Sequence, residues 1–64
     1  MKRKLLIAYL NREGCTLARE GSRHSLFVNQ SNGQVSAVPR HAEIKDLLVK
    51  EICKDLGIPY PGKN

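Results

Sequence analysis

The residues with the clearest chemical potential are Ser22, Arg23 and His24, which stand together directly after Gly21. A histidine has an unperturbed pKa of about 6.5, so its imidazole can take or give a proton near neutral pH. An arginine is a permanent cation that can bind two phosphate oxygens at once. Cleavage of RNA by its own 2′-hydroxyl needs both proton transfer and stabilisation of an anionic phosphorus. We therefore take His24 as the candidate general acid or base and Arg23, with Ser22 beside it, as the candidate phosphate contact.

The same residues also have ordinary structural explanations. His24 shares the strand alternation of Leu26 and Val28, so it could be a half-buried strand residue that donates to a backbone carbonyl. Ser22 is of a type that often stabilises turns. His41 stands just before the last predicted helix, where a local backbone or capping role is expected. An acid–base pair of His24 and His41 requires that the fold bring them together.

Positive charge is concentrated in the N-terminal third of the chain. The formal net charge is +5; residues 1–23 carry six basic and two acidic residues (+4), and residues 24–64 carry five and four (+1). A pI of about 9.6 favours a polyanionic partner such as nucleic acid, although ordinary solubility charge is the alternative. The further residues that we expect to contact RNA are Lys2, Arg3, Lys4, Arg40 and His41.

The first half of the chain predicts a helix followed by two strands. Apolar residues at helical spacing, Leu6, Tyr9 and Leu10, predict a helix from residue 2 to 13, with Leu5 in a neighbouring buried row. Strands are expected over residues 15–20 and 24–29. The turn between them is expected to use a positive φ at Gly21.

The second half predicts a third strand and a closing helix. Asn32-Gly33 is typical of a type I′ hairpin and leads to a strand over residues 34–38, which ends before Pro39. The last helix is expected to bury a stripe of residues, namely Ile44, Leu47, Leu48, Ile52 and Leu56. Left-handed glycine caps are expected at Gly14 and Gly57.

These elements predict an α+β domain in which a helix, a three-stranded antiparallel sheet and a second helix follow one another. Both helices must bury an apolar stripe, so we expect them to cover one face of the sheet and leave the other free. A length of 64 residues allows one domain, expected over residues 1–58, with a mobile tail over residues 59–64.

Several function classes lack sequence support. Cys15 and Cys53 do not form a metal-ligand spacing and are expected in the core, and no glycine-rich phosphate loop is present. We expect neither a metal nor a cofactor. No secretory signal or membrane span is recognisable, so a cytoplasmic protein without membrane attachment is expected.

Three short motifs, in their order and spacing, are similar to those of one known family. They are Gly21-Ser22-Arg23-His24, Val38-Pro39-Arg40-His41, and the helix from Glu43-Ile44-Lys45 to Lys54-Asp55-Leu56-Gly57-Ile58. In these features the chain resembles, from about Leu5 to Ile58, the HicA family of mRNA-cleaving toxins from toxin–antitoxin pairs.

The resemblance implies a fold like a double-stranded-RNA-binding domain and an endoribonuclease that cleaves mRNA and blocks translation, with His24 as its catalytic histidine. It also implies a HicB-type antitoxin that covers the His24 face, so that the toxin is part of a hetero-oligomer with its antitoxin and a monomer when free. Many members have a second histidine where this chain has Arg23. Two other classes stay open: a non-catalytic RNA-binding module and a basic interaction protein.

Overall fold

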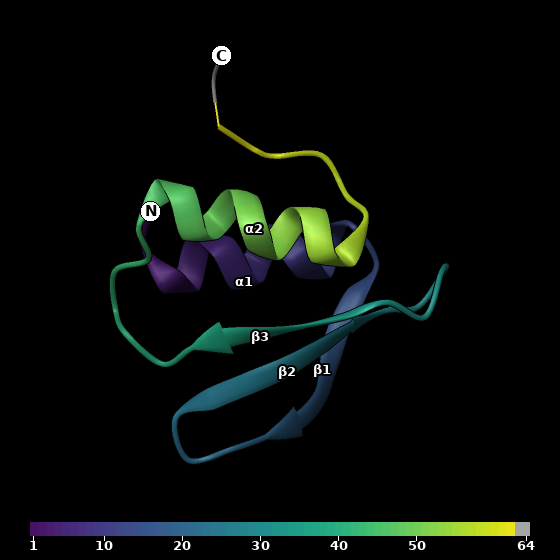
Figure 1. The fold of residues 1–64 in the computed structure, drawn as a ribbon, viewed down its shortest axis with the longest axis horizontal. Helices are drawn as coiled ribbons and strands as arrows, with labels where there is room; N and C mark the ends of the chain where they lie inside the picture. The colour runs from purple at the N-terminus through teal and green to yellow at the C-terminus, as the bar shows by residue number, and fades with distance from the viewer. Residues whose placement is uncertain (63–64) are drawn as a thin grey trace.

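The computed structural model describes residues 1–62 of the chain. Its elements are α1 (Arg3–Arg12), β1 (Cys15–Glu20), β2 (His24–Asn29), β3 (Val35–Pro39) and α2 (Asp46–Leu56). The strands form one antiparallel sheet in the order β1-β2-β3. Both helices cover the same face of this sheet and run in the same direction (Figure 1). The predicted α+β arrangement of helix, three-stranded sheet and helix is therefore confirmed.

Helix α1 buries one row of side chains against the sheet and α2. Leu6, Tyr9 and Leu10 are buried, as their spacing predicts. The prediction that Leu5 belongs to a neighbouring buried row is wrong, because its side chain is 56% exposed. Successive residues of an α-helix are about 100° apart, so the rotation that buries Leu6 turns Leu5 toward solvent.

Helix α2 buries a different face from the one that the sequence predicts. Its buried residues are Val49, Ile52, Cys53 and Leu56. Leu47 and Leu48, expected in the core, are 74% and 39% exposed. The error has a local cause: Lys45 has extended backbone angles and α2 begins only at Asp46, so Ile44 is buried from a non-helical link and does not share the phase of the helix.

The sheet presents one face to the helices and leaves the other open. On the central strand β2, Ser25, Phe27 and Asn29 are buried beneath the helices, and the side chains between them point the opposite way. Strand β1 has a register shift between Leu17 and Arg19, which places Arg19 opposite Leu26. Strand β3 is shifted by one residue from its predicted bounds and includes Pro39.

The β1–β2 turn is tight, but not for the expected reason. Among residues 1–62, positive φ is found at Gly14, Gly33 and Gly57, and not at Gly21. The Gly21 amide donates to the carbonyl oxygen of His24 over 2.8 Å. A Cβ at Gly21 would lie 2.8 Å from that same oxygen. Glycine is therefore required here by close backbone approach, whereas the caps at Gly14 and Gly57 are left-handed as predicted.

The β2–β3 turn is wider than the type I′ hairpin that Asn32-Gly33 predicts, because Asn32 does not have positive φ. The Asn29 amide donates to the Gln34 carbonyl over 2.8 Å, which closes a four-residue loop. Inside the loop the Asn29 side-chain oxygen accepts the amide of Ser31 over 3.0 Å. The side chain of Asn29 organises this turn in addition to its glycine.

Pro59 and Tyr60, which follow α2, contact both helices. The Tyr9 hydroxyl donates to the carbonyl of Pro59 over 2.6 Å, and the Lys50 ammonium lies 5.3 Å from the centre of the Tyr60 ring. The mobile tail expected over residues 59–64 stays a prediction, and its last two residues lie outside the described part of the chain. None of the helices within residues 1–62 is both long enough and apolar enough to cross a membrane.

Candidate functional site

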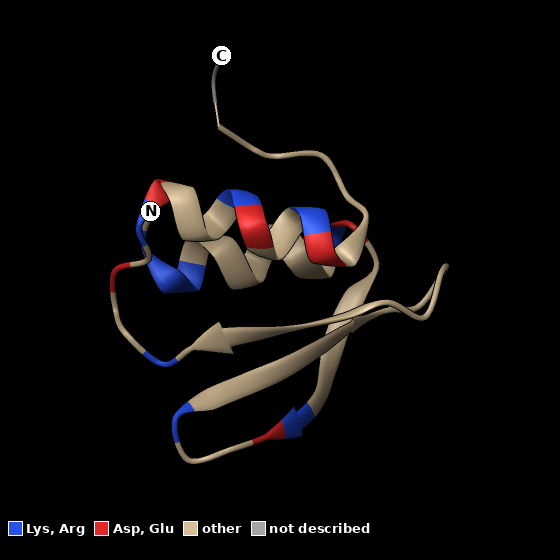
Figure 2. Ribbon diagram, viewed as in Figure 1, with Lys and Arg blue, Asp and Glu red and all other residues tan. Residues whose placement is uncertain are grey.

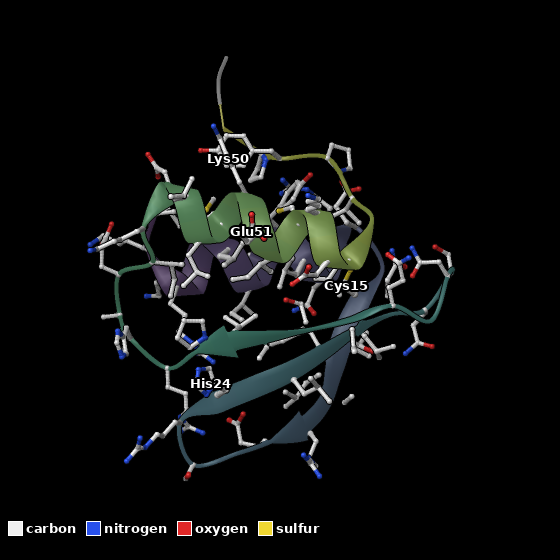
Figure 3. All side chains as sticks on the ribbon, in the orientation of Figure 1. Cys15, His24, Lys50 and Glu51 are labelled. Carbon is white, nitrogen blue, oxygen red and sulfur yellow. The ribbon has the colours of Figure 1, made fainter. Side chains whose placement is uncertain are left out.

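His24 begins β2 at the end of the sheet that holds the β1–β2 turn (Figure 3). Its side chain is exposed, and it alternates with the buried Ser25. The explanation in which His24 is a half-buried strand residue therefore does not hold. Within residues 1–62 its imidazole has no hydrogen-bond partner. Both ring nitrogens are available to a ligand.

The backbone that carries His24 is held by Arg40, which follows β3. The Arg40 guanidinium lies 2.9 Å from the Glu20 carboxylate and donates to the Gly21 carbonyl over 3.1 Å. The Arg40 amide donates to the Arg23 carbonyl over 3.2 Å, next to the register pair of His24 and Pro39. Both sides of the turn are thus tied to the segment after β3.

Arg3 ties the first turn of α1 to the same end of the sheet. Its Nε donates to the Pro39 carbonyl over 2.8 Å, and its Nη2 donates to the Ser25 hydroxyl over 2.8 Å. Ser25 in turn donates to the carboxylate of Glu20. A chain of polar contacts therefore runs from α1 through the sheet to the turn. Sequence reasoning missed Glu20 and Ser25, because neither stands in a recognisable spacing with Arg3.

His41 lies on a link that is bound to the start of α1. The Arg3 amide donates to the Ala42 carbonyl over 2.8 Å, and the Ile44 amide donates to the Met1 carbonyl over 2.8 Å. His41 itself is exposed. The expected capping role is wrong, since the N-cap of α2 is Lys45, which makes no side-chain cap hydrogen bond.

Two hollows meet at His24. We call the first the hairpin hollow; it lies on the open face of the sheet, and its lining includes Arg19, Ser22, Arg23, His24, Leu26 and Ala37. We call the second the histidine hollow; its lining includes Ser22, Arg23, His24, Arg40, His41 and Leu48. The fold thus places both histidines in the wall of one hollow.

A third hollow extends this region toward the start of α1. It is lined by Lys2, Arg3, Lys4, Arg40 and Ala42, so Arg40 belongs to it and to the histidine hollow. We call the five cations Lys2, Arg3, Lys4, Arg23 and Arg40 the basic edge. Figure 2 shows basic residues at the start of α1, on the link after β3 and in the β1–β2 turn, along one side of the molecule.

The cations of the basic edge differ in whether they already bind acceptors within the protein. Arg3 and Arg40 donate to protein acceptors, as described above. Lys2, Lys4 and Arg23 are exposed and form no ion pair within the described residues. These three are the members best able to exchange water for phosphate oxygens.

An apolar groove borders the histidine hollow on the side of α2. We call it the α2 groove; its lining includes Pro39, His41, Ile44, Leu47, Leu48 and Glu51. Pro39, His41 and Leu48 line both depressions. Sequence reasoning missed this groove because it assigned Leu47 and Leu48 to the core.

The two cysteines lie away from the site. Cys15 is at the opposite end of the sheet from His24 (Figure 3), and Cys53 is buried in α2. Burial raises the pKa of the Cys53 thiol to about 11 and also raises the pKa of Cys15. Neither is a reactive thiolate near neutral pH. Among residues 1–62 no three histidine, cysteine, aspartate or glutamate side chains gather so as to hold a metal ion.

The fold and its basic edge define a small, basic α+β protein with the element order of a double-stranded-RNA-binding domain. A family model described as the HicA toxin of bacterial toxin–antitoxin systems matches residues 3–58. The chain belongs to the HicA toxin family, as its motifs indicate, and is the toxin of a toxin–antitoxin pair. No curated protein and no solved structure matches the chain.

Proposed function

We propose that this toxin is a metal-independent endoribonuclease that cleaves mRNA in the cytoplasm and so blocks translation. The observation that carries the proposal is the exposed imidazole of His24, whose charged neighbours in the hairpin hollow are the guanidinium groups of Arg19 and Arg23. The family supports the same activity, because HicA toxins are generally ribonucleases.

The geometry suits attack of a 2′-hydroxyl on the adjacent phosphorus. A phosphate seated beside His24 meets the Arg23 guanidinium, which can stabilise the negative charge that grows on the phosphoryl oxygens. The Ser22 hydroxyl lines the same hollow and can donate to a phosphate oxygen. His24 can transfer a proton at the reacting linkage, a contribution of roughly 10²- to 10⁴-fold in rate.

The basic edge gives the RNA a path to this phosphate. Its cations form a row from the start of α1 to the β1–β2 turn, so several phosphates of one strand can be contacted together. Such contacts carry no base information, and we expect weak intrinsic sequence preference. A sharp single-site digestion pattern across unrelated RNAs would contradict this expectation.

The test is incubation of the purified toxin with end-labelled RNA in the presence of a chelator. We expect the wild type to cut and to leave 2′,3′-cyclic phosphate ends, and His24→Ala to bind RNA without cutting. Lys54→Ala, on an exposed residue of α2, is the control and should cut like the wild type. If the wild type cuts neither free RNA nor RNA on translating ribosomes, the proposal fails. Circular dichroism shows whether His24→Ala remains folded.

The same experiment separates the two rival classes. A non-catalytic RNA-binding module binds RNA with an affinity that falls steeply with salt, but no variant cuts. A basic interaction protein does not bind RNA even at low salt.

We propose that a HicB-type antitoxin neutralises the toxin by covering the histidine hollow and the adjoining α2 groove. The groove offers the exposed leucines Leu47 and Leu48, and the hollow offers Arg23 to acidic groups. We expect Leu47→Asp to lose co-purification with the antitoxin but to keep RNA cleavage. Leu5→Asp, an equal charge change on exposed α1, is the control. Equal capture of both variants would place the antitoxin elsewhere.

A further inference from the structure

His41 is the one other imidazole of the chain, and the proposed function gives it no part in the chemistry. It lines the histidine hollow together with His24, although 17 positions separate them in the sequence. The two approach the hollow from different elements, His24 from β2 and His41 from the link between β3 and α2. A phosphodiester held in this hollow therefore meets a wall to which both histidines contribute.

The link that carries His41 is held on both sides of this residue. Before it, the Arg40 amide donates to the Arg23 carbonyl over 3.2 Å, and the Arg40 guanidinium pairs with Glu20. After it, Ala42 accepts the Arg3 amide over 2.8 Å. A fixed backbone limits the positions that the exposed imidazole can reach. Proton transfer to one particular oxygen requires such a limited position.

The charged surroundings of the two imidazoles differ. Arg19 lines the hairpin hollow beside His24, and Arg23 and Arg40 line the histidine hollow that both imidazoles share. Around His41 the adjoining α2 groove adds Glu43, Lys45 and Glu51. Carboxylates complement a positively charged imidazolium donor, whereas the arginines around His24 complement a phosphate. The arginines therefore favour a phosphate on the side of His24, and the carboxylates lie on the side of His41.

We propose that His41 is a second catalytic residue, the general acid that protonates the leaving 5′-oxygen while His24 acts as the general base. The inference rests on the proposed ribonuclease function and deepens it. His24 takes the proton of the 2′-hydroxyl as O2′ forms its bond to phosphorus. As the bond from phosphorus to O5′ breaks, O5′ receives a proton from the imidazolium of His41. The products are a 2′,3′-cyclic phosphate and a 5′-hydroxyl, and subsequent proton exchange with water restores both histidines.

A substrate with a better leaving group tests this assignment directly. The RNA carries one bridging 5′-sulfur at a linkage that the wild type cuts, with the all-oxygen RNA as its match. A thiolate leaves without being protonated, so the general acid is not needed for the sulfur linkage. We expect His41→Ala to slow cleavage of the oxygen linkage by about 10²- to 10⁴-fold and of the sulfur linkage by only a few fold. His24→Ala should slow both linkages strongly.

Three outcomes overturn the inference. In the first, His41→Ala slows cleavage of both linkages equally. In the second, His41→Ala cuts at the wild-type rate. In the third, the sulfur linkage restores cleavage by His24→Ala and not by His41→Ala. In the first case His41 only binds or positions the RNA. The circular dichroism of His41→Ala should match the wild type, because the side chain is exposed. A wild type that cuts neither linkage rejects the proposed function itself, which is a distinct result.

Discussion

Arg40 and Glu20 form an ion pair of 2.9 Å that joins the segment after β3 to β1, the strand before the turn that leads to His24. The same guanidinium donates to the Gly21 carbonyl, and the Arg40 amide holds the carbonyl of Arg23. Both side chains of the pair are about half exposed. Such a pair adds little to the free energy of unfolding, so we assign it to the placement of the turn that carries His24.

This assignment predicts that Glu20→Gln separates activity from stability. We expect the free energy of unfolding to fall by less than about 1 kcal/mol, as for exposed pairs in general. Cleavage should fall by up to about 10²-fold, because small displacements of a reacting group are costly. Chemical denaturation and single-turnover cleavage measure the two effects.

The control for Glu20→Gln is Glu13→Gln, which makes the same charge change just after α1, near the end of the sheet opposite to His24. It should leave cleavage of RNA within a few fold of the wild type. Equal losses in both variants would show that net charge, and not the ion pair, governs the activity.

Gly21→Ala should displace the turn. Its Cβ would lie 2.8 Å from the carbonyl oxygen of His24, a backbone atom that cannot rotate away. We expect a loss of about 1 to 3 kcal/mol in the free energy of unfolding. The rate of cleavage by the folded variant should also fall, because the movement shifts His24, the residue that carries the imidazole.

Gly33→Ala is the matched comparison for Gly21→Ala. Gly33 has φ of +75° in the turn at the other end of β2, with open space around it. An alanine there costs about 1 to 2 kcal/mol through its backbone conformation alone. Cleavage by folded Gly33→Ala should equal that of the wild type, and a similar loss in both variants would contradict the proposed role of the turn.

Most of the fold could be predicted because its signals are local. The alternation of Ser25, Phe27 and Asn29 with the residues between them, and the glycines that end both helices, depend on neighbours in the sequence. The phase of α2 could not be predicted in this way. Ile44 fits the helical spacing of Ile52 and Leu56, and only the extended backbone at Lys45 shows that it belongs to the preceding link.

The candidate site was predicted in part for the same reason. His24, Arg23 and Ser22 are adjacent in the sequence, so their grouping needs no tertiary information. The placement of His41 in the same hollow as His24 does need tertiary information. It depends on the pairing of β2 with β3 and on the hydrogen bond between Arg40 and Arg23. Tertiary contacts of this kind leave no spacing signal in one sequence.

The buried thiol of Cys53 predicts a loss of stability at alkaline pH. Burial raises its pKa to about 11, so folding favours the neutral thiol. The contribution of this group to the free energy of unfolding is complete below the ordinary thiol pKa of about 8.5 and is lost as the pH rises toward 11. Denaturation at pH 8, 9, 10 and 11 measures the decline.

Cys53→Ala identifies the source of that decline. It should reduce the slope of stability against pH without abolishing it, because burial also raises the pKa of Cys15 and of Tyr9. An unchanged slope would show that Cys53 does not titrate in this range.

The basic edge predicts a specific salt dependence of RNA binding. The doubly substituted Lys2→Gln/Lys4→Gln should bind more weakly at low salt, because two phosphate contacts are lost. The slope of log affinity against log salt should become shallower by about 0.7 for each contact with a single strand. Binding is measured in the His24→Ala background, so that the RNA stays intact.

The matched control removes two lysines from α2, as Lys50→Gln/Lys54→Gln. Lys50 lies on α2 beside the C-terminal segment (Figure 3), where its ammonium is over the ring of Tyr60. The two double variants have the same net charge, so a general attraction between protein and RNA would lower both slopes equally. We expect only the substitutions at the start of α1 to change the slope, because a direct phosphate contact releases counterions and a distant charge does not. Equal slopes in the two variants would show that RNA does not follow the basic edge to His24.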